Sequence, residues 1–300
     1  MEEKETKQKK GIGKWLDRLI NIAFGLCVLV VAYVVLQVFV VTFFKIPSDS
    51  MAPTLMPGDY VLVDKCSGGA RLFNVFDAVD GKEVEIHRVP GWRKFKRNDV
   101  LVFNFPYQKG RWDSIAFDVM KYYVKRCVAV PGDTLEIRKG HYRIVGYPGS
   151  VGYLPAQERM ELLPDSGAIG VEMETFLRHK DHKWTVKEFG PLPVPAKGQV
   201  VRIDSISGLI YRQLIGWEQK KKLRLEADGS VRLGDSLIHE YRFRENYYFV
   251  AGDRAENSQD SRYWGLLPEP FIVGKVWRIW KSEEKGTGII RWERVGKKVE

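Results

Sequence analysis

The chain has 300 residues, of which 44% are hydrophobic, with 28 Gly and 14 Pro. This composition excludes a disordered chain and is enough for one large domain or two smaller ones. A formal net charge of +10 favours an acidic partner, either nucleic acid or the anionic head groups of a membrane.

A long uncharged segment follows the basic N-terminus. No charged residue occurs from Leu19 to Phe44, and residues 22–44 are almost entirely apolar. As an α-helix, residues 22–44 cover roughly 34 Å, which is enough for a hydrocarbon core of about 30 Å. A cleaved secretory signal has a shorter apolar stretch that ends in small residues, whereas this one ends in Val41-Thr-Phe-Phe-Lys45. We therefore expect an uncleaved transmembrane anchor at residues 19–44, rather than a signal peptide or a buried core helix.

The distribution of basic residues predicts the orientation of this anchor. Six basic residues lie before the apolar segment, whereas the next twenty or so residues after it carry only Lys45 and Lys65. The positive-inside rule therefore predicts that residues 1–18 form a cytoplasmic tail and that the chain from Lys45 onward lies on the outer face. This placement argues against nucleic acid as a partner and favours the membrane surface. The six residues before the segment are Lys4, Lys7, Lys9, Lys10, Lys14 and Arg18.

Beyond Phe44 the sequence predicts a mainly antiparallel β-structure. Short β-like runs are separated by turn signals such as Pro57-Gly58 and Pro131-Gly132, with no long amphipathic helix and no alternation of strands and helices. The runs cover residues 60–63, 100–103, 122–130, 134–137, 247–251 and 271–280.

Residues 139–244 differ in texture from the segments on either side. They are more charged and richer in isolated Gly and Pro, as in residues 188–195. We expect an inserted, β-rich second domain between two halves of a core, residues 45–138 and residues 245–300. Nothing in the sequence indicates what this insertion binds.

The sequence gives little support for a metal site, a cofactor site or a disulfide bond. None of the five His, at positions 87, 141, 179, 182 and 239, belongs to an HExxH motif, and His179-Lys-Asp-His182 is only a weak metal signal. A Gly-x-Ser-x-Gly motif is absent, so a Ser-His-Asp triad has no clear location. Cys27 lies in the apolar run, which leaves Cys66 and Cys127 as the only possible disulfide pair, and no spacing demands it. We expect no metal and no cofactor.

The loop directly after the apolar segment carries two hydroxyl groups. Its sequence is Ile46-Pro-Ser-Asp-Ser-Met-Ala-Pro-Thr-Leu55, in which Pro47 and Pro53 stiffen the backbone around Ser48 and Ser50. Such a loop at the bilayer surface can reach a substrate that is still held in lipid. On this loop alone, an ordinary polar linker remains an equal alternative.

Four blocks of sequence resemble, in order, the four motif boxes of bacterial type I signal peptidases, the leader peptidases that use a Ser/Lys dyad. They are Ser48-Asp-Ser-Met-Ala-Pro-Thr-Leu55, Arg97-Asn-Asp-Val-Leu-Val-Phe103, Tyr123-Val-Lys-Arg-Cys-Val-Ala-Val-Pro-Gly-Asp133 and, in the last block, residues 252–265. The resemblance implies a mainly β catalytic domain of signal peptidase type after one N-terminal transmembrane helix. For residues 139–244 it implies only a general likeness to the family's second, non-catalytic domain.

The resemblance also implies catalytic roles. Ser50 would be the nucleophile and Lys125 the general base, while the Ser48 hydroxyl and the Ser50 backbone N–H would form the oxyanion hole. Ser258 would hydrogen-bond and orient the Lys125 amine. A lysine accepts a proton only when neutral, so its pKa must fall several units below about 10.4, and apolar burial is the usual cause. Apolar neighbours of Lys125 in the sequence are Tyr123, Val124, Val128 and Val130.

Family substrates carry small residues, typically Ala, first and third before the cleavage site. Shallow apolar pockets reject large side chains by steric overlap, so small residues should be tolerated broadly. By the same mapping, the pocket for the first residue would be lined by Ile46, Met51, Leu55 and Tyr123. The pocket for the third would be lined by Phe44, Ile46, Val102 and Val124.

Two departures from the family pattern concern the site. Asp49 stands where the family most often has Gly, and its carboxylate would raise the Lys125 pKa if it pointed inward; we expect it to point outward. The common Gly-Asp-Asn-Arg becomes Gly252-Asp-Arg-Ala255, so either Arg254 substitutes for the usual Arg or that contact is missing. Asp260 and Arg262 remain, and we expect them to pair as scaffold.

Three functions are compatible with these features. The first is a membrane-bound serine endopeptidase of the bacterial plasma membrane that removes signal peptides from exported preproteins, with membrane lipid as a second partner. The second is a self-cleaving Ser/Lys protease of the repressor type, which would be soluble and carry a DNA-binding domain, and neither feature is seen. The third is a catalytically inactive, membrane-tethered module that binds signal sequences. The oligomeric state is not predicted.

Overall fold

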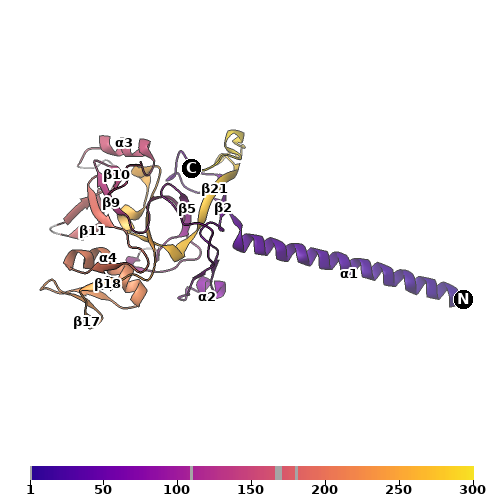
Figure 1. The fold of residues 1–300 in the computed structure, drawn as a ribbon. Helices are drawn as coiled ribbons and strands as arrows, with labels where there is room; N and C mark the ends of the chain where they lie inside the picture. The colour runs from indigo at the N-terminus through magenta and orange to yellow at the C-terminus, as the bar shows by residue number, and fades with distance from the viewer. Residues whose placement is uncertain (1, 109–110, 166–170, 180–181) are drawn as a thin grey trace.

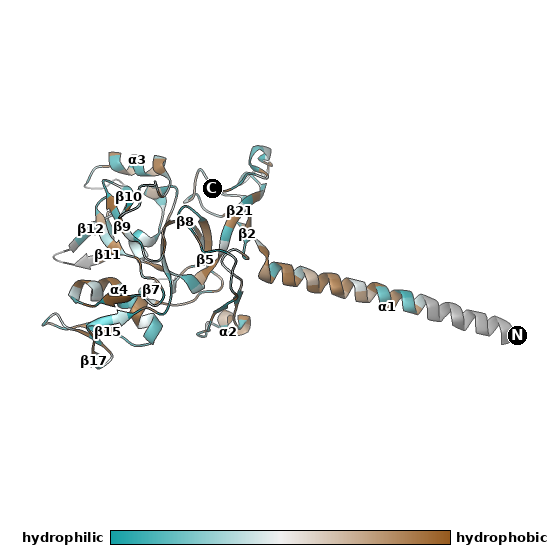
Figure 2. Cartoon of the chain, viewed as in Figure 1, coloured by the Kyte–Doolittle hydropathy of each residue, from teal (hydrophilic) through white to brown (hydrophobic). Residues whose placement is uncertain are grey.

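The computed structural model describes residues 2–108, 111–165, 171–179 and 182–300. A helix of 38 residues, α1 (Glu2–Phe39), extends away from a β-rich body (Figure 1). Its segment Trp15–Phe39 is long and apolar enough to cross a membrane, and none of it is buried within the described protein. The same segment forms a brown, apolar stretch next to the body in Figure 2.

The helix ends at Phe39, so the predicted anchor at residues 19–44 was too long. Residues Val41–Lys45 instead form strand β1, which pairs antiparallel with β2 (Asp59–Asp64) in a register that sets Phe44 opposite Val61. β-Branched and aromatic residues favour strands, and the sequence Val-Thr-Phe-Phe consists of such residues only. Hydropathy alone does not separate this apolar strand from the apolar helix that precedes it.

The body is built on one antiparallel sheet, and the predicted mainly β fold is confirmed. Its strand order is β1-β2-β21-β5-β8-β19-β20, so the C-terminal strand β21 lies between two strands from the first half of the chain. Each predicted β-like run overlaps a strand, although residues 130 and 271 lie just outside β8 and β21. The bounds of the remaining strands of this sheet are β5 (Val100–Asn104), β8 (Tyr122–Ala129), β19 (Tyr247–Ala251), β20 (Leu267–Pro268) and β21 (Ile272–Ser282).

Smaller elements surround this sheet. Between β2 and β8 these are β3 (Arg71–Leu72), α2 (Val75–Val79), β4 (His87–Arg88), β6 (Tyr107–Gln108) and β7 (Arg111–Ile115). After β8 follow β9 (Thr134–Arg138), β10 (His141–Ile144), α3 (Leu154–Leu162), β11 (Glu174–His179), β12 (His182–Thr185), β13 (Phe189–Pro193), β14 (Val200–Arg202), α4 (Ser205–Gln219), β15 (Leu223–Leu225), β16 (Val231–Leu233), β17 (Ser236–Leu237) and β18 (Glu240–Arg242). Short helical turns follow β19 and β21, namely η1 (Ala255–Asn257), α5 (Ser261–Trp264), η2 (Glu269–Phe271) and η3 (Trp292–Arg294).

Helix α4 contradicts the expectation that the chain has no long amphipathic helix. It has 15 residues and begins at a capping box in which Asp204 accepts hydrogen bonds from the backbone N–H groups of Ile206 and Ser207. Two glycines, Gly208 and Gly216, weaken its helical pattern in the sequence. Gly208 is needed because a Cβ there would lie 2.9 Å from Val231 of β16. Close packing, rather than propensity, therefore explains this helix.

Two apolar clusters fix the position of the site. The larger cluster runs from Phe103 of β5 through Phe249 of β19 to Phe189 of β13 and Tyr211 of α4, so residues 139–244 share this core with the main sheet. The smaller cluster lies under the loop between β1 and β2 and joins the loop to the sheet. Its buried members include Ile46, Met51, Leu55, Val100, Val102 and Val273.

Candidate active site

The structure brings Ser50 and Lys125 into direct contact. Ser50 lies in the loop formed by residues 46–58, whose ends are joined by hydrogen bonds from the Ile46 N–H to Asp59 O (2.8 Å) and from the Gly58 N–H to Ile46 O (2.9 Å). Lys125 lies in the middle of β8, opposite Leu101 of β5. Its Nζ is 2.7 Å from Ser50 Oγ. A loop residue and an interior strand residue thus form one hydrogen-bonded pair.

Lys125 is in the environment that a lysine base requires. It is only 2% exposed, and burial lowers its pKa to about 8, against the opposing effects of Asp260 and Asp253. The ordinary lysine pKa is 10.5. At pH 7, a group of pKa 8 is neutral in about one molecule in ten. A usable fraction of the neutral amine therefore exists near neutral pH.

Donors for an oxyanion are free beside Ser50. Ser48 is exposed, and within the residues that the structure describes neither its hydroxyl nor the Ser50 backbone N–H makes a hydrogen bond. Unpaired donors beside a nucleophile can stabilise the negative charge that develops on a carbonyl oxygen during attack. The expected oxyanion hole therefore has its two donors available.

The predicted hydrogen bond between Ser258 and Lys125 is not formed. Ser258 Oγ is buried and makes no hydrogen bond to Lys125 in the described part of the chain, whereas its hydroxyl helps to lower the pKa of the neighbouring Asp260 carboxyl. The extended backbone after η1 places Ser258 against Gly252, where an added Cβ would collide with the Ser258 side chain and lie 2.6 Å from Ser50 O. Ser258 is thus close to the pair but does not orient the amine.

Asp260 and Arg262 form a buried scaffold next to the pair. Arg262 donates from Nε to Asp260 Oδ1 (2.8 Å) and from Nη2 to Asp260 Oδ2 (2.9 Å), and Asp260 also accepts from the Gly252 N–H (3.0 Å). Burial would raise the pKa of the Asp260 carboxyl, but the Arg262 guanidinium and these hydrogen bonds hold it below its ordinary value. Asp260 therefore stays ionised, and the pair fixes the backbone at Gly252.

A second buried ion pair was not predicted from the sequence. Arg126, next to Lys125 on β8, donates from Nε to Asp253 Oδ1 (2.7 Å) and from Nη2 to Asp253 Oδ2 (2.6 Å). Its Nη1 also donates to the carbonyl oxygens of Asn98 and Glu300. One side chain thus connects β8, the segment after β19 and the C-terminus. Both partners lie in the motif boxes, but their contact cannot be inferred from either box alone.

The candidate substrate-binding residues divide between the two apolar clusters. Tyr123 packs in the larger cluster, with its ring centroid 4.6 Å from that of Phe105. Its ring also lies 5.6 Å from Lys125 Nζ. Six others gather in the smaller cluster beside the Ser50 loop, namely Phe44, Ile46, Met51, Leu55, Val102 and Val124.

The two departures from the family pattern meet in space. The Arg254 guanidinium forms an ion pair with Asp49, and Asn257 Nδ2 donates to Asp49 Oδ1 (3.1 Å). The carboxylate is therefore held by partners in the segment after β19. Ala255 is 2% exposed and packs with Ala156 and Met160 of α3. Arg254 thus pairs with Asp49, and Ala255 lies in an enclosed position against α3.

Several other candidates lie outside this site. His141 pairs with Glu161 on the surface, and the side chains of His179 and His182 lie outside the described part of the structure. No cluster of potential metal ligands occurs among the described residues. The three cysteines are free thiols, so Cys66 and Cys127 do not form a disulfide.

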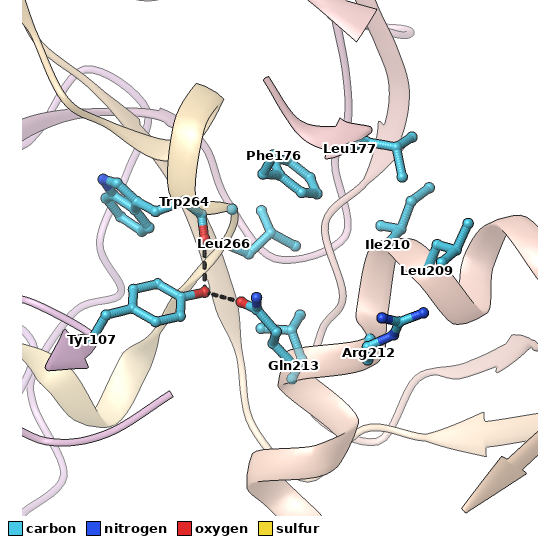
Figure 3. Close-up of a pocket in the computed structure, with 11 residues that line it drawn as sticks. Tyr107, Phe176, Leu177, Leu209, Ile210, Arg212, Gln213, Trp264 and Leu266 are labelled. Carbon is cyan, nitrogen blue, oxygen red and sulfur yellow. Dashed lines mark hydrogen bonds between the residues drawn. The ribbon is translucent and has the colours of Figure 1, made fainter. Parts of the chain in front are cut away.

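A cavity of about 190 Å³ lies between α4, β11 and the residues after α5 (Figure 3). Its lining includes neither Ser50 nor Lys125. The Tyr107 hydroxyl donates to Trp264 O (2.7 Å) and hydrogen-bonds Gln213 at one side of the cavity, as the dashed lines show. These contacts join α4 to the core and make the cavity a packing feature between elements.

A family model and curated relatives place the chain in one family. Residues 18–280 match the family described as signal peptidase, peptidase S26. The chain is 27% identical over 277 residues to signal peptidase I of Buchnera aphidicola, an alignment that covers 90% of this chain and 80% of that protein. It is 27% identical over 275 residues to signal peptidase I of Pseudomonas aeruginosa, covering 87% of this chain and 73% of the relative. A solved signal peptidase I from Enterococcus faecalis has 19% identity and a TM-score of 0.28, covering 61% of this chain and 97% of its own.

Proposed function

Because the chain belongs to the signal peptidase family of S26 peptidases, we propose that it removes N-terminal signal peptides with Ser50 as nucleophile and Lys125 as general base. The family makes the chain a serine endopeptidase. The observation that carries the residue assignment is the 2.7 Å contact between Ser50 Oγ and the Nζ of a buried lysine.

The geometry supports the following sequence of steps. Neutral Lys125 takes the proton from Ser50 Oγ as the oxygen attacks the carbonyl carbon of the scissile peptide bond. The Ser48 hydroxyl and the Ser50 N–H stabilise the resulting oxyanion, and one such donor typically contributes roughly 100- to 1000-fold in rate. Lys125 then gives this proton to the amine nitrogen as the peptide C–N bond breaks, which leaves the acyl group as an ester on Ser50 Oγ. Lys125 next takes a proton from a water molecule that attacks the ester carbon, and returns it to Ser50 Oγ as the ester C–O bond breaks and the carboxylic acid product leaves.

We propose that α1 anchors the enzyme in the bacterial plasma membrane with its basic N-terminus in the cytoplasm and the catalytic body on the outer, periplasmic face. The helix end is fastened to the body, because Lys65 Nζ donates to Gln37 O at 2.7 Å. Phe43 and Trp280 are exposed and lie edge to face near this junction, with ring centroids 6.2 Å apart. The amphipathic ring of a tryptophan such as Trp280 favours the interface between lipid and water, and the neighbouring exposed Phe43 adds apolar surface, which together support contact of the body with lipid.

The experiment that tests the function is cleavage of a purified preprotein by the full-length chain in detergent. A preprotein with Ala first and third before the cleavage site should be shortened, and one with Phe at the first position should not. Ser50→Ala should cleave neither. Equal processing of the Ala and Phe substrates would contradict the assignment of a shallow apolar pocket beside Ser50.

The alternative of an inactive module that binds signal sequences loses its main support. It rested on Asp49 and Ala255, and both residues have a structural explanation in the contacts with Arg254 and α3. Binding of the preprotein without any cleavage by the unmodified chain would favour that alternative.

A further inference from the structure

The loop that carries Ser50 is held on both sides of the nucleophile by one residue. The backbone N–H of Arg254 donates to Ser50 O at 3.0 Å, and the Arg254 guanidinium pairs with Asp49. Asn257 adds a third contact through its hydrogen bond to Asp49 Oδ1. The segment after β19 thus fixes the backbone of Ser50 and the side chain of the residue before it.

This segment is in turn supported by the inserted part of the chain. Arg159 of α3 donates from Nε to Glu256 Oε1 at 3.0 Å and from Nη2 to Glu256 Oε2 at 3.4 Å. Glu256 Oε1 also lies 3.9 Å from Arg254 Nε. Charges therefore alternate from Arg159 through Glu256 and Arg254 to Asp49. Below them, Ala255 packs against α3.

We propose that Arg254 is a positioning residue for the nucleophile, and that α3 of the inserted segment supports it through Glu256. This inference rests on the proposed function and assigns part of the inserted segment a role in catalysis. Arg254 acts in two ways. It fixes the loop so that Ser50 Oγ stays within reach of Lys125, and its positive charge offsets the carboxylate that Asp49 places beside the nucleophile.

The exposure of the pair separates this role from a purely structural one. The Arg254 and Asp49 side chains are 43% and 39% exposed, and ion pairs at such positions contribute little to the free energy of unfolding. Loss of the pair should therefore change the rate of cleavage and leave the melting temperature almost unchanged. A small displacement of a reacting group is enough for a large loss of rate, because attack requires near-ideal geometry.

The charge of Asp49 provides a second measurable effect of changing Arg254, namely a shift in the pH dependence of cleavage. The pKa of Lys125 is lowered by burial and further influenced by Asp260, Asp253 and Arg262, and Arg254→Gln alters none of these side chains. Without the Arg254 charge, the Asp49 carboxylate favours the protonated amine, so the rise of activity with pH should move to higher pH. Replacing Asp49 as well removes this effect.

The test compares Arg254→Gln, Asp49→Asn and the double variant in the full-length chain in detergent. Arg254→Gln should lower kcat by roughly 10- to 100-fold with little change in KM, a loss expected from misplacement of a reacting group. Its pH profile should move to higher pH, and the double variant should return the profile to the position of the unmodified enzyme. Arg254→Lys should restore part of kcat, and Arg159→Gln should lower kcat less than Arg254→Gln does.

A matched control is available in another part of the inserted segment. Arg224 and Asp235 form an exposed ion pair in the hairpins of β15–β17, with Nη2 and Oδ1 3.2 Å apart, so Arg224→Gln should leave kcat and the pH profile unchanged. Unchanged kcat in Arg254→Gln, an unmoved pH profile, or a loss of kcat matched by a fall in melting temperature would overturn the positioning role. Cleavage by Ser50→Ala would instead overturn the proposed function itself, which distinguishes the two failures.

Discussion

Arg126 and Asp253 form a two-pronged ion pair directly behind Lys125, and both side chains are almost completely buried. Removing one partner of such a pair leaves an uncompensated buried charge, which typically costs about 3–5 kcal/mol of stability. We therefore predict that Arg126→Met lowers the free energy of unfolding by about this amount, measured by denaturant titration. An exposed pair is the control: Arg224→Met, which removes a partner of Asp235, should change stability by less than about 1 kcal/mol. Equal effects of the two substitutions would contradict the structural role of Arg126.

Gly252 provides the second prediction, because an alanine Cβ there would lie 2.6 Å from Ser50 O and 2.6 Å from Ser258 Cβ. At least one of these neighbours must move, and movement of Ser50 breaks its alignment with Lys125. Gly252→Ala should therefore reduce cleavage by roughly 100-fold, the loss expected when a reacting group is misplaced by about 1 Å. Gly25→Ala in α1 is the control, since its added Cβ meets no atom within 4 Å. Normal cleavage by Gly252→Ala would show that the loop tolerates displacement.

The third prediction is that burial of Lys125 lowers the free energy of unfolding. The pKa of Lys125 is about 8 in the folded chain and 10.5 in the ordinary reference state. Because the unfolded chain binds this proton more tightly than the folded chain does, protonation of Lys125 favours unfolding, and the whole effect is present below about pH 8. This difference corresponds to about 3 kcal/mol at pH 7. Lys125→Met should therefore be inactive but more stable than the unmodified chain at pH 7. The difference in free energy of unfolding between Lys125→Met and the unmodified chain should become smaller as pH rises from about 8 to 10.5, because the unfolded chain then loses the same proton. A difference that stays constant with pH would argue against a buried lysine of lowered pKa.

The boundary between α1 and β1 gives the fourth prediction. Removal of residues 1–39 leaves β1 paired with β2, whereas removal of residues 1–44 takes away almost all of this strand and the Phe44 side chain of the smaller cluster. The shorter deletion should give an active domain that still binds lipid vesicles. The longer deletion should lose most of its activity, measured on the same preprotein. Equal activity of the two forms would show that β1 does not shape the site.

The sequence was sufficient to select Ser50 and Lys125, which the structure brings into contact, because the two residues lie in short, recognisable segments. Ser50 lies between two prolines shortly after the long apolar segment, and Lys125 lies in a run of apolar residues that is typical of a strand. Turn pairs such as Pro131-Gly132 marked the ends of the strands correctly. These signals are local, and local signals survive in a single sequence.

The features that the sequence did not reveal depend on contacts between distant segments. Asp49 and Arg254 are 205 residues apart, and nothing near either residue indicates that they meet. The side-chain direction of Ser258 depends on how closely the chain passes Gly252. The end of α1 was misplaced because the same apolar residues serve first a helix and then a strand.

The dependence of kcat/KM on pH tests the central proposal most directly. Lys125 must be neutral to accept the Ser50 proton, so kcat/KM should rise through a pKa near 8 and stay high in the alkaline range. Each of the five His→Ala variants should show the same profile, and Lys125→Met should show no cleavage at any pH. A rise near pH 6.5 that disappears on replacement of a single histidine, or cleavage that survives in Lys125→Met, would contradict a Ser50–Lys125 mechanism.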